Sequence, residues 1–221
     1  MSETPQQEVI ERRARSEAQV WENSVYYETA EKWTPIFWSP QGRFLPLFEQ
    51  LELTSTLELA CGHGRHSEYL LAHYGPKIKR LLMTDILKTN IDYCMARIGP
   101  NPKISLFVNN GVDFRPVESA SLSAIFCYDA MVHFHRDVVR SYLGDIARAL
   151  IPGGKALLHH SNYAQGSDTS YGSNPHARAY MTTSLFAEYA RAANLVVSDQ
   201  SIFDWSRVQD LDALTLVQKP L

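Results

Sequence analysis

Two short stretches of the sequence combine residue types that suit ligand binding. The stretch Cys61-Gly62-His63-Gly64 follows an apolar run and precedes a helical pattern. Glycine lets the backbone come close to a ligand, and the start of a helix presents unpaired N–H groups. Asp85 ends the next apolar run, and a carboxylate there can accept hydrogen bonds from both hydroxyls of a ribose. A plain tight turn at the glycines and a helix cap at Asp85 are the structural alternatives.

Four histidines gather behind two later apolar runs. His133 and His135 follow one run, and the pair His159-His160 ends the next. An imidazole can take up a proton near neutral pH without the help of an ion. A magnesium site needs several carboxylates, and Asp129 is the only obvious acid nearby, so we expect a histidine base and no metal. Because side chains alternate along a strand, only one of His159 and His160 can face a shared cleft.

The elements that must position these residues alternate along the chain. From residue 56 onward, short apolar runs are separated by amphipathic segments, which predicts an α/β fold with a mainly parallel sheet and helices on both faces. We expect strands over 56–60, 78–85, 103–110, 122–130, 155–162, 195–205 and 212–218. We expect helices over the first thirty residues and over 65–74, 87–98, 136–150 and 182–193. The last two strands leave no room for a helix between them and should pair antiparallel.

The carboxyl ends of parallel strands meet at one edge of a sheet, and ligands bind in the crevice there. The residues that follow the predicted strands are rich in glycine and polar side chains, at 60–64, 85, 109–112, 128–133 and 159–162. The need for loops between strands and helices does not by itself explain so many glycine and polar residues at these positions. We therefore expect one site at this edge.

The stretch "ELACGHGRHS" resembles motif I of the class I S-adenosylmethionine-dependent methyltransferases. Glu58, Ala60, Gly62 and Gly64 match its acid and its three glycine-like positions, with Ala60 in place of the first glycine. The resemblance extends over about residues 56 to 218 and includes the Pro-Gly-Gly turn before the fifth strand. It implies a Rossmann-like fold of seven mostly parallel strands, with helices on both faces and an antiparallel last strand. It also implies S-adenosyl-L-methionine as cofactor.

The resemblance places the cofactor on the loops after the first four strands. Asp85 would bind the ribose, the glycines would lie beside the methionine part, and Glu58 would face the positive charges. Asn110 or Asp113 would meet the adenine amine, and the choice between them is open. The expected cofactor-binding residues are Glu58, Ala60, Cys61, Gly62, Gly64, Asp85, Ile86, Asn110, Gly111, Val112, Tyr128 and Trp33.

The segments at either side of the predicted sheet suit the binding of a methyl acceptor. The stretch "WENSVYYETAEKWTPIFW" is rich in aromatic residues, whose faces suit a sulfonium cation. The resemblance implies that residues 1–50 form a helical lid over a methyltransferase domain at 51–221. The polar stretch that begins at Asn162 and contains Arg178 is long for a compact domain, which favours a substrate-facing rim. The expected substrate-binding residues are Tyr26, Asp129, His159, Asn162 and Arg178.

Composition excludes several classes of protein. The formal net charge of −3 offers no basic surface for nucleic acid or for an anionic membrane. Three scattered cysteines do not form a disulfide framework, and the charged N-terminus lacks the apolar core of a signal peptide. We therefore expect a cytoplasmic monomer or homodimer that acts on a small molecule.

These residues predict O-methylation of a small polar molecule by a general base. His133 is the first choice for the base because it follows the fourth strand, near the expected methyl group. His160 is the second choice, and Tyr27 or Tyr26 would orient either one. The rate should rise with pH through an apparent pKa of about 6–7, the range of a mildly perturbed histidine. N-methylation and a non-catalytic cofactor-binding scaffold are the alternatives.

Overall fold

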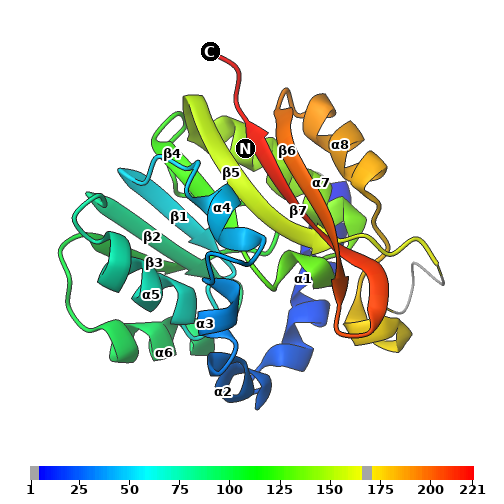
Figure 1. The fold of residues 1–221 in the computed structure, drawn as a ribbon, viewed down its shortest axis with the longest axis horizontal. Helices are drawn as coiled ribbons and strands as arrows, with labels where there is room; N and C mark the ends of the chain where they lie inside the picture. The colour runs from blue at the N-terminus through cyan, green and yellow to red at the C-terminus, as the bar shows by residue number, and fades with distance from the viewer. Residues whose placement is uncertain (1–4, 166–170) are drawn as a thin grey trace.

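A computed structural model describes residues 5–165 and 171–221, and these form one twisted sheet flanked by helices (Figure 1). The strands run in the order β3-β2-β1-β4-β5-β7-β6, so the order reverses between β1 and β4. Strands β1 to β5 are mutually parallel, and β7 pairs antiparallel with both β5 and β6. The predicted fold class is confirmed. The strands are β1 Ser55–Leu59, β2 Arg80–Asp85, β3 Ile104–Val108, β4 Leu122–Cys127, β5 Leu150–Ser161, β6 Val196–Trp205 and β7 Val208–Gln218.

Two apolar clusters, one on each face of the sheet, bind the helices to it. One cluster holds buried side chains of α4, α5 and α6, together with Trp38, Phe126 and Leu216. The other holds buried side chains of α7 and α8 with Leu57 and Leu158. Alternation along each strand sends successive apolar residues to opposite clusters, which explains why the central strands are apolar throughout. These helices are α4 Phe44–Phe48, α5 Arg65–Tyr74, α6 Lys88–Ile98, α7 Arg136–Ala149 and α8 Thr183–Ala192.

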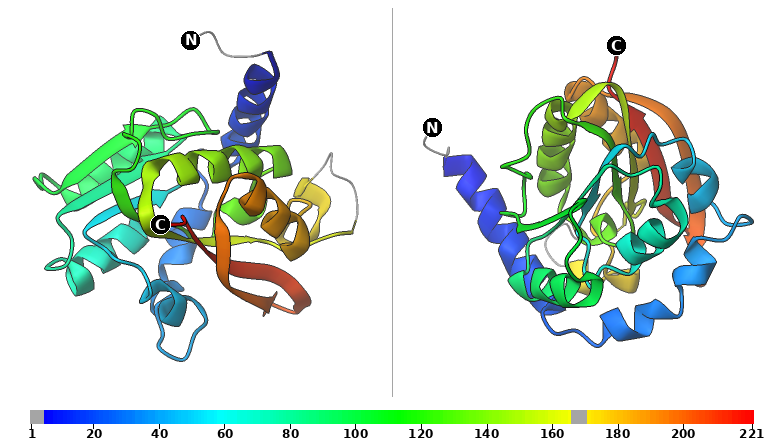
Figure 2. Two further views of the ribbon diagram at one scale, coloured as in Figure 1. Left: turned by 90° about the horizontal axis from the view of Figure 1, so that it is seen from above. Right: turned by 90° about the vertical axis from the view of Figure 1, so that its left-hand side faces the viewer.

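The N-terminal segment is several short helices, so the prediction of one helix over the first thirty residues is wrong. The chain forms α1 (Pro5–Ala18), a 3-10 turn (Gln19–Trp21) and α2 (Tyr26–Glu31), followed by α3 (Thr34–Phe37). The break contains Asn23 at φ 56, a left-handed conformation that asparagine tolerates well. Figure 2 shows α1 in dark blue at the outside of the molecule, and α2 lies near the edge where the parallel strands end.

The proposed division at residue 50 remains a prediction. Trp38 and Phe48, which precede this boundary, are fully buried in the same cluster as Leu81 and Phe126 of the sheet. The Pro-Gly-Gly turn expected before the fifth strand lies inside β5. Leu150 pairs with Leu122, and the register then shifts before Lys155 pairs with Ala124. No described helix is long and apolar enough to cross a membrane.

Candidate active site

A cavity lies at the carboxyl ends of the strands, beside the point where the strand order reverses. It encloses about 1040 Å³ when the open space at its mouth is counted. One wall consists of the loops after β1, β2, β3 and β4. The opposite wall consists of side chains from residues 14–31, which we call the N-terminal cover. The cover contributes Ala14, Glu17, Ala18, Trp21, Tyr26, Tyr27, Ala30 and Glu31.

The carboxylate of Asp85 forms hydrogen bonds to two loops, the one after β1 and the one after β2. Its Oδ2 accepts the N–H of Gly62 at 2.9 Å, and its Oδ1 accepts the N–H of Leu87, the residue before α6, at 2.9 Å. Burial raises the pKa of this carboxyl, and the two N–H donors oppose that change. Asp85 lines the cavity too. Asp85 thus holds the turn before α6 without capping the helix, whose N-cap residue is Leu87, and it also reaches the cavity.

The two loop glycines serve different purposes. Gly62 lines the cavity at φ +52, and a Cβ there would lie 2.9 Å from Cε1 of Tyr27. Gly64 at φ +79 is not a lining residue, and a Cβ there would lie 3.0 Å from Sγ of Cys94 on α6. Gly62 thus keeps space beside the cavity, whereas Gly64 lets α6 pack against the loop. Tyr27, predicted to orient the base, instead stacks on His63 with 4.2 Å between ring centroids.

Glu58 lies beneath the loop and does not line the cavity. Its carboxyl accepts a hydrogen bond from the Ser67 hydroxyl, and burial raises its pKa to about 8. A carboxyl with that pKa is mostly protonated at neutral pH. The structure therefore corrects the expectation that Glu58 faces the charges of the cofactor.

The loop after β3 presents Asn109 to the cavity, one residue before the asparagine that the sequence favoured. Asn109 and Gly111 line the cavity together with Ile86. The side chain of Asn110 turns away, where its Nδ2 donates to Glu11 at 2.8 Å and its Oδ1 accepts the N–H of Val112. Val112 is fully buried in the core.

Asp129 connects the end of β4 to the N-terminal cover. It is buried at φ 58, and its carboxylate accepts the hydroxyl of Tyr26 and the guanidinium of Arg65, the latter at 2.9 Å. Arg65 also donates to the carbonyl of Ala30 at 2.6 Å. Burial, followed by the charge of Asp129, raises the pKa of Tyr26, so its hydroxyl stays a donor. Tyr26 and Asp129, both predicted to bind substrate, thus lie together at the cavity.

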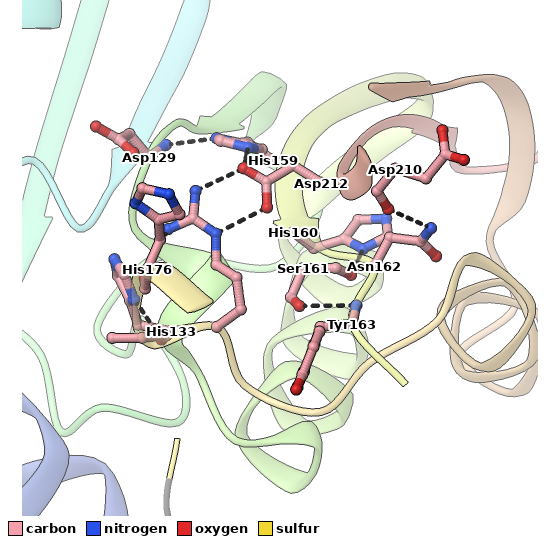
Figure 3. A network of polar contacts seen from close by, with 12 residues as sticks. Asp129, His133, His159, His160, Ser161, Asn162, Tyr163, His176, Asp210 and Asp212 are labelled. Carbon is pink, nitrogen blue, oxygen red and sulfur yellow. Dashed lines mark hydrogen bonds and ion pairs between the residues drawn. The ribbon is translucent and has the colours of Figure 1, made fainter. Parts of the chain in front are cut away.

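A buried network holds the backbone of Asp129 from behind (Figure 3). The N–H of Asp129 donates to Nδ1 of His159 at 3.0 Å, and Nε2 of His159 donates to Asp212 at 3.0 Å. Arg178 binds both carboxylate oxygens of Asp212, and these partners lower the pKa of that carboxyl to about 2 against the effect of burial. His159 and Arg178 do not line the cavity. They position Asp129, and the structure does not bring them to the cavity, where they were predicted to bind substrate.

His133 lines the cavity and stacks against Trp21, with 4.6 Å between ring centroids. Its Nδ1 donates to the carbonyl of Ala177 at 2.8 Å, because a carbonyl can only accept. Nε2 is therefore the basic nitrogen of the neutral ring. Burial, followed by the charge of Arg178, lowers the pKa of His133 to about 4. This value lies below the one expected from the sequence.

Three further predicted site residues lie away from the cavity. His160 points to the opposite face of the sheet, where it stacks on Phe186 at 3.9 Å and its Nε2 contacts the Thr215 hydroxyl. Successive side chains of β5 point to opposite faces of the sheet, so His160 and His159 lie on different faces. The side chain of Asn162 bonds to the backbone of Asp210 in β7 and of Thr183 at the start of α8. Trp33 is 42 % exposed. Residues 166–170 of the predicted rim lie outside the described part of the chain.

Several lining residues escaped prediction. Cys61 and Tyr128 line the cavity as expected. His63 and Asn109 also line it; both fall in the predicted strand-end stretches but were given no role there. Trp21, Arg65, His66 and Phe134 line it and were not assigned to the site. The position of Arg65 and His66 directly after the glycine loop was the available signal, because the first turn of a helix that follows such a loop faces the same crevice. Trp21 begins the aromatic stretch predicted to belong to the lid, but nothing local indicated that its ring reaches the cavity. Its place depends on the break after α1.

The cavity fits an adenosyl ligand. An acid stands at the end of β2, and two glycines lie where side chains would fill space, since a Cβ on Gly111 would lie 2.5 Å from Cδ1 of Ile86. Residues 56–154 match the family model described as a methyltransferase domain. The fold and this match define the class of the protein: it is a class I S-adenosylmethionine-dependent methyltransferase. S-adenosylmethionine is the cofactor of this class of enzyme.

Solved structures show the same fold at low identity. The methyltransferase in complex with the Trm112 activator of Haloferax volcanii is 18% identical, with a TM-score of 0.68, 91% of this chain and 97% of that chain covered. An S-adenosylmethionine-dependent methyltransferase of Clostridium acetobutylicum is 14% identical (TM-score 0.62, coverage 90% and 100%). The N-methyltransferase NodS of Bradyrhizobium japonicum is 17% identical (TM-score 0.59, coverage 80% and 92%). No curated protein sequence matches the chain.

Replacing Tyr26 with phenylalanine is expected to weaken the contact between the cover and Asp129. The variant loses one hydrogen bond to a charged group, worth about 1.5–3 kcal/mol, while Arg65 still pairs with Asp129. We expect kcat/KM for the methyl acceptor to fall about tenfold or more, and the unfolding temperature to fall by a few degrees because the same bond stabilises the free protein. Tyr93→Phe, an exposed tyrosine on α6, is the control. An unchanged kcat/KM in Tyr26→Phe would show that this contact does not shape the site.

Proposed function

We propose that this methyltransferase acts on a small polar molecule that binds between Asp129, His133 and the N-terminal cover. The observation that carries the proposal is that the strand-end loops and the cover enclose one cavity, with His133 on its wall. Bound S-adenosylmethionine supplies an activated methyl group. The chain must then hold the cofactor, orient the acceptor and receive a proton.

The lining residues suit these three tasks. Asp85 is placed for the ribose, and Asn109 and Gly111 for the adenine, because they follow β2 and β3 at the same edge. Asp129 can accept a hydrogen bond from the acceptor next to Tyr26. Nε2 of His133 can receive the proton that an alcohol loses, since Nδ1 already carries one. Positioning the acceptor in line with the methyl group contributes as well.

Transfer to an amine is the second candidate, and one observation favours it. The pKa of His133 is lowered to about 4 by burial, which makes its ring a weak base. A neutral amine attacks with its own lone pair and needs no base before the methyl group moves. The rate with an amine should rise with pH through the pKa of the amine itself. If the acceptor is an alcohol and His133 is the base, the rate should instead rise with pH through the pKa of His133.

A labelling experiment tests the proposed function. The purified protein is incubated with methyl-labelled S-adenosylmethionine and a cell extract separated into small molecules, proteins and nucleic acids. We expect label in the small-molecule fraction alone. Label in the protein or nucleic-acid fraction would refute the substrate class. Binding of the cofactor without transfer to any fraction would favour the non-catalytic scaffold.

We expect methyl transfer to continue in excess EDTA. Within residues 5–165 and 171–221, no three His, Cys, Asp or Glu side chains gather where they could hold a metal ion. Asp85 and Asp129, the acids after β2 and β4, are already engaged by N–H, hydroxyl and guanidinium donors. The measurement compares turnover before and after chelation. Loss of activity that Mg²⁺ or Mn²⁺ restores would make these acids metal ligands.

A further inference from the structure

His66 is a buried histidine on the wall of the cavity with one ring nitrogen engaged by the protein. It is the second residue of α5, it is 4 % exposed, and it is one of the lining residues. The indole N–H of Trp38 contacts Nδ1 of His66 at 3.1 Å. An indole nitrogen is only a donor, so Nδ1 must be the acceptor and carries no proton. In the neutral ring the proton is therefore on Nε2.

Nε2 of His66 has no hydrogen-bond partner within the described part of the chain. Burial, followed by the nearby charge of Arg65, lowers the pKa of His66 well below its usual value, so the ring is neutral at pH 7 and Nε2–H is a donor. Buried polar groups in native proteins almost always have a partner, and an exception at a cavity wall points to a ligand. Trp38, Phe37 and Tyr128 surround the ring with centroids 6.0, 6.2 and 5.4 Å away.

The chemistry of the missing partner follows from its surroundings. An N–H donor requires an acceptor, which excludes an ammonium group. The neighbouring Arg65 adds positive charge on the same side of the loop, where it already binds Asp129 and the carbonyl of Ala30. Both features favour an oxygen that carries negative charge.

We propose that His66 is a ligand-binding residue whose Nε2–H donates to a carboxylate oxygen of the molecule in the cavity. Two sources offer this chemistry: the amino-acid carboxylate of the cofactor and a carboxylate on the methyl acceptor. The proposal rests on the proposed function only if the carboxylate belongs to the methyl acceptor. In either case Trp38 acts as a positioning residue, because its indole selects the tautomer that can donate.

The first experiment measures binding by calorimetry with two probes that share the adenosine part. S-adenosylhomocysteine has the amino-acid carboxylate, and 5′-methylthioadenosine lacks it. His66→Asn keeps an oxygen for the Trp38 indole and loses the reach of Nε2. If the cofactor is the source, we expect S-adenosylhomocysteine to bind this variant about ten- to thirtyfold more weakly, with unchanged binding of 5′-methylthioadenosine. His66→Gln, which can extend an amide N–H to the position of Nε2, should restore at least part of the affinity.

The second experiment tests the acceptor as the source. The ¹⁵N-labelled protein is saturated with S-adenosylhomocysteine and titrated with acetate, a simple carboxylate, while the Nε2–H resonance of His66 is followed by NMR. A saturable shift, together with unchanged cofactor affinity in His66→Asn, assigns the carboxylate to the acceptor. His73→Asn, an exposed histidine on the same helix, is the control and should alter neither measurement.

The proposal is overturned if His66→Asn binds both adenosine probes as the wild type does and acetate leaves the resonance in place. It is also overturned if the spectrum shows the proton on Nδ1. Failure of the proposed function has a different signature, since the wild type would then transfer no label to small molecules although its Nε2–H resonance still responds to S-adenosylhomocysteine.

Discussion

Asp85→Ala is expected to weaken S-adenosylhomocysteine binding at least a hundredfold. The substitution removes the acceptor for the ribose hydroxyls and also releases the N–H groups of Gly62 and Leu87, which the carboxylate now holds. Hydrogen bonds to a charged group contribute about 1.5–3 kcal/mol each, and a tenfold change in affinity corresponds to about 1.4 kcal/mol. Losing two of them therefore gives a hundredfold change or more. Calorimetry with the purified variant measures it.

Two further variants separate ribose binding from a general disturbance of α6. Asp92→Ala removes an exposed acid from the same helix, where it pairs with Lys88, and should leave the affinity unchanged. Asp85→Asn keeps the volume and one oxygen, so its affinity should lie between those of wild type and Asp85→Ala. If Asp85→Ala binds S-adenosylhomocysteine with wild-type affinity, Asp85 does not bind the ribose.

His133→Gln is expected to lower kcat at least a hundredfold with little change in cofactor affinity. A general base contributes about 10²- to 10⁴-fold, and an amide cannot accept the proton. The pH dependence of the wild-type rate should reflect the pKa of the His133 ring. Because burial lowers the folded pKa of His133 to about 4, the basic form is already present above that pH. The rate should rise with pH through about 4 and stay flat between about 6 and 8.

Two other histidines supply the controls for this prediction. His176→Gln, at an exposed position, should keep wild-type kcat. His160→Gln alters a buried ring on Phe186, so it should lower the unfolding temperature more than kcat. Near wild-type kcat in His133→Gln would reject this ring as the base, and an amine acceptor would then explain the reaction better.

The fold was largely predictable because its signals are local. Alternating apolar and amphipathic segments define the strands and helices, and the glycines after β1 with the acid after β2 mark the carboxyl edge of the sheet. Asp85, Gly62 and Tyr128 were found at the cavity for that reason. Their positions depend on strand ends, which a single sequence reveals.

The remaining site residues depend on contacts between distant segments. Tyr26 and Asp129 are 103 positions apart, and nothing local indicates that they meet. Which of Asn109 and Asn110 faces the cavity depends on how the chain leaves β3, which the apolar pattern does not resolve. His160 was misplaced because both histidines of β5 are fully buried, one on each side of the strand.

The two walls of the cavity have independent origins, and this matters for how the protein can change. The loop wall is tied to strand pairing and to Asp85, so alterations there endanger both fold and cofactor. The N-terminal cover is one contiguous stretch, attached through side chains such as Arg97, which pairs with Glu31 at 2.6 Å. Exchanging residues within 14–31 reshapes the cavity without touching the core strands. On the proposed function, in which the acceptor binds against this cover, exchange of this one short segment would change the acceptor while the loops assigned to the cofactor stay the same.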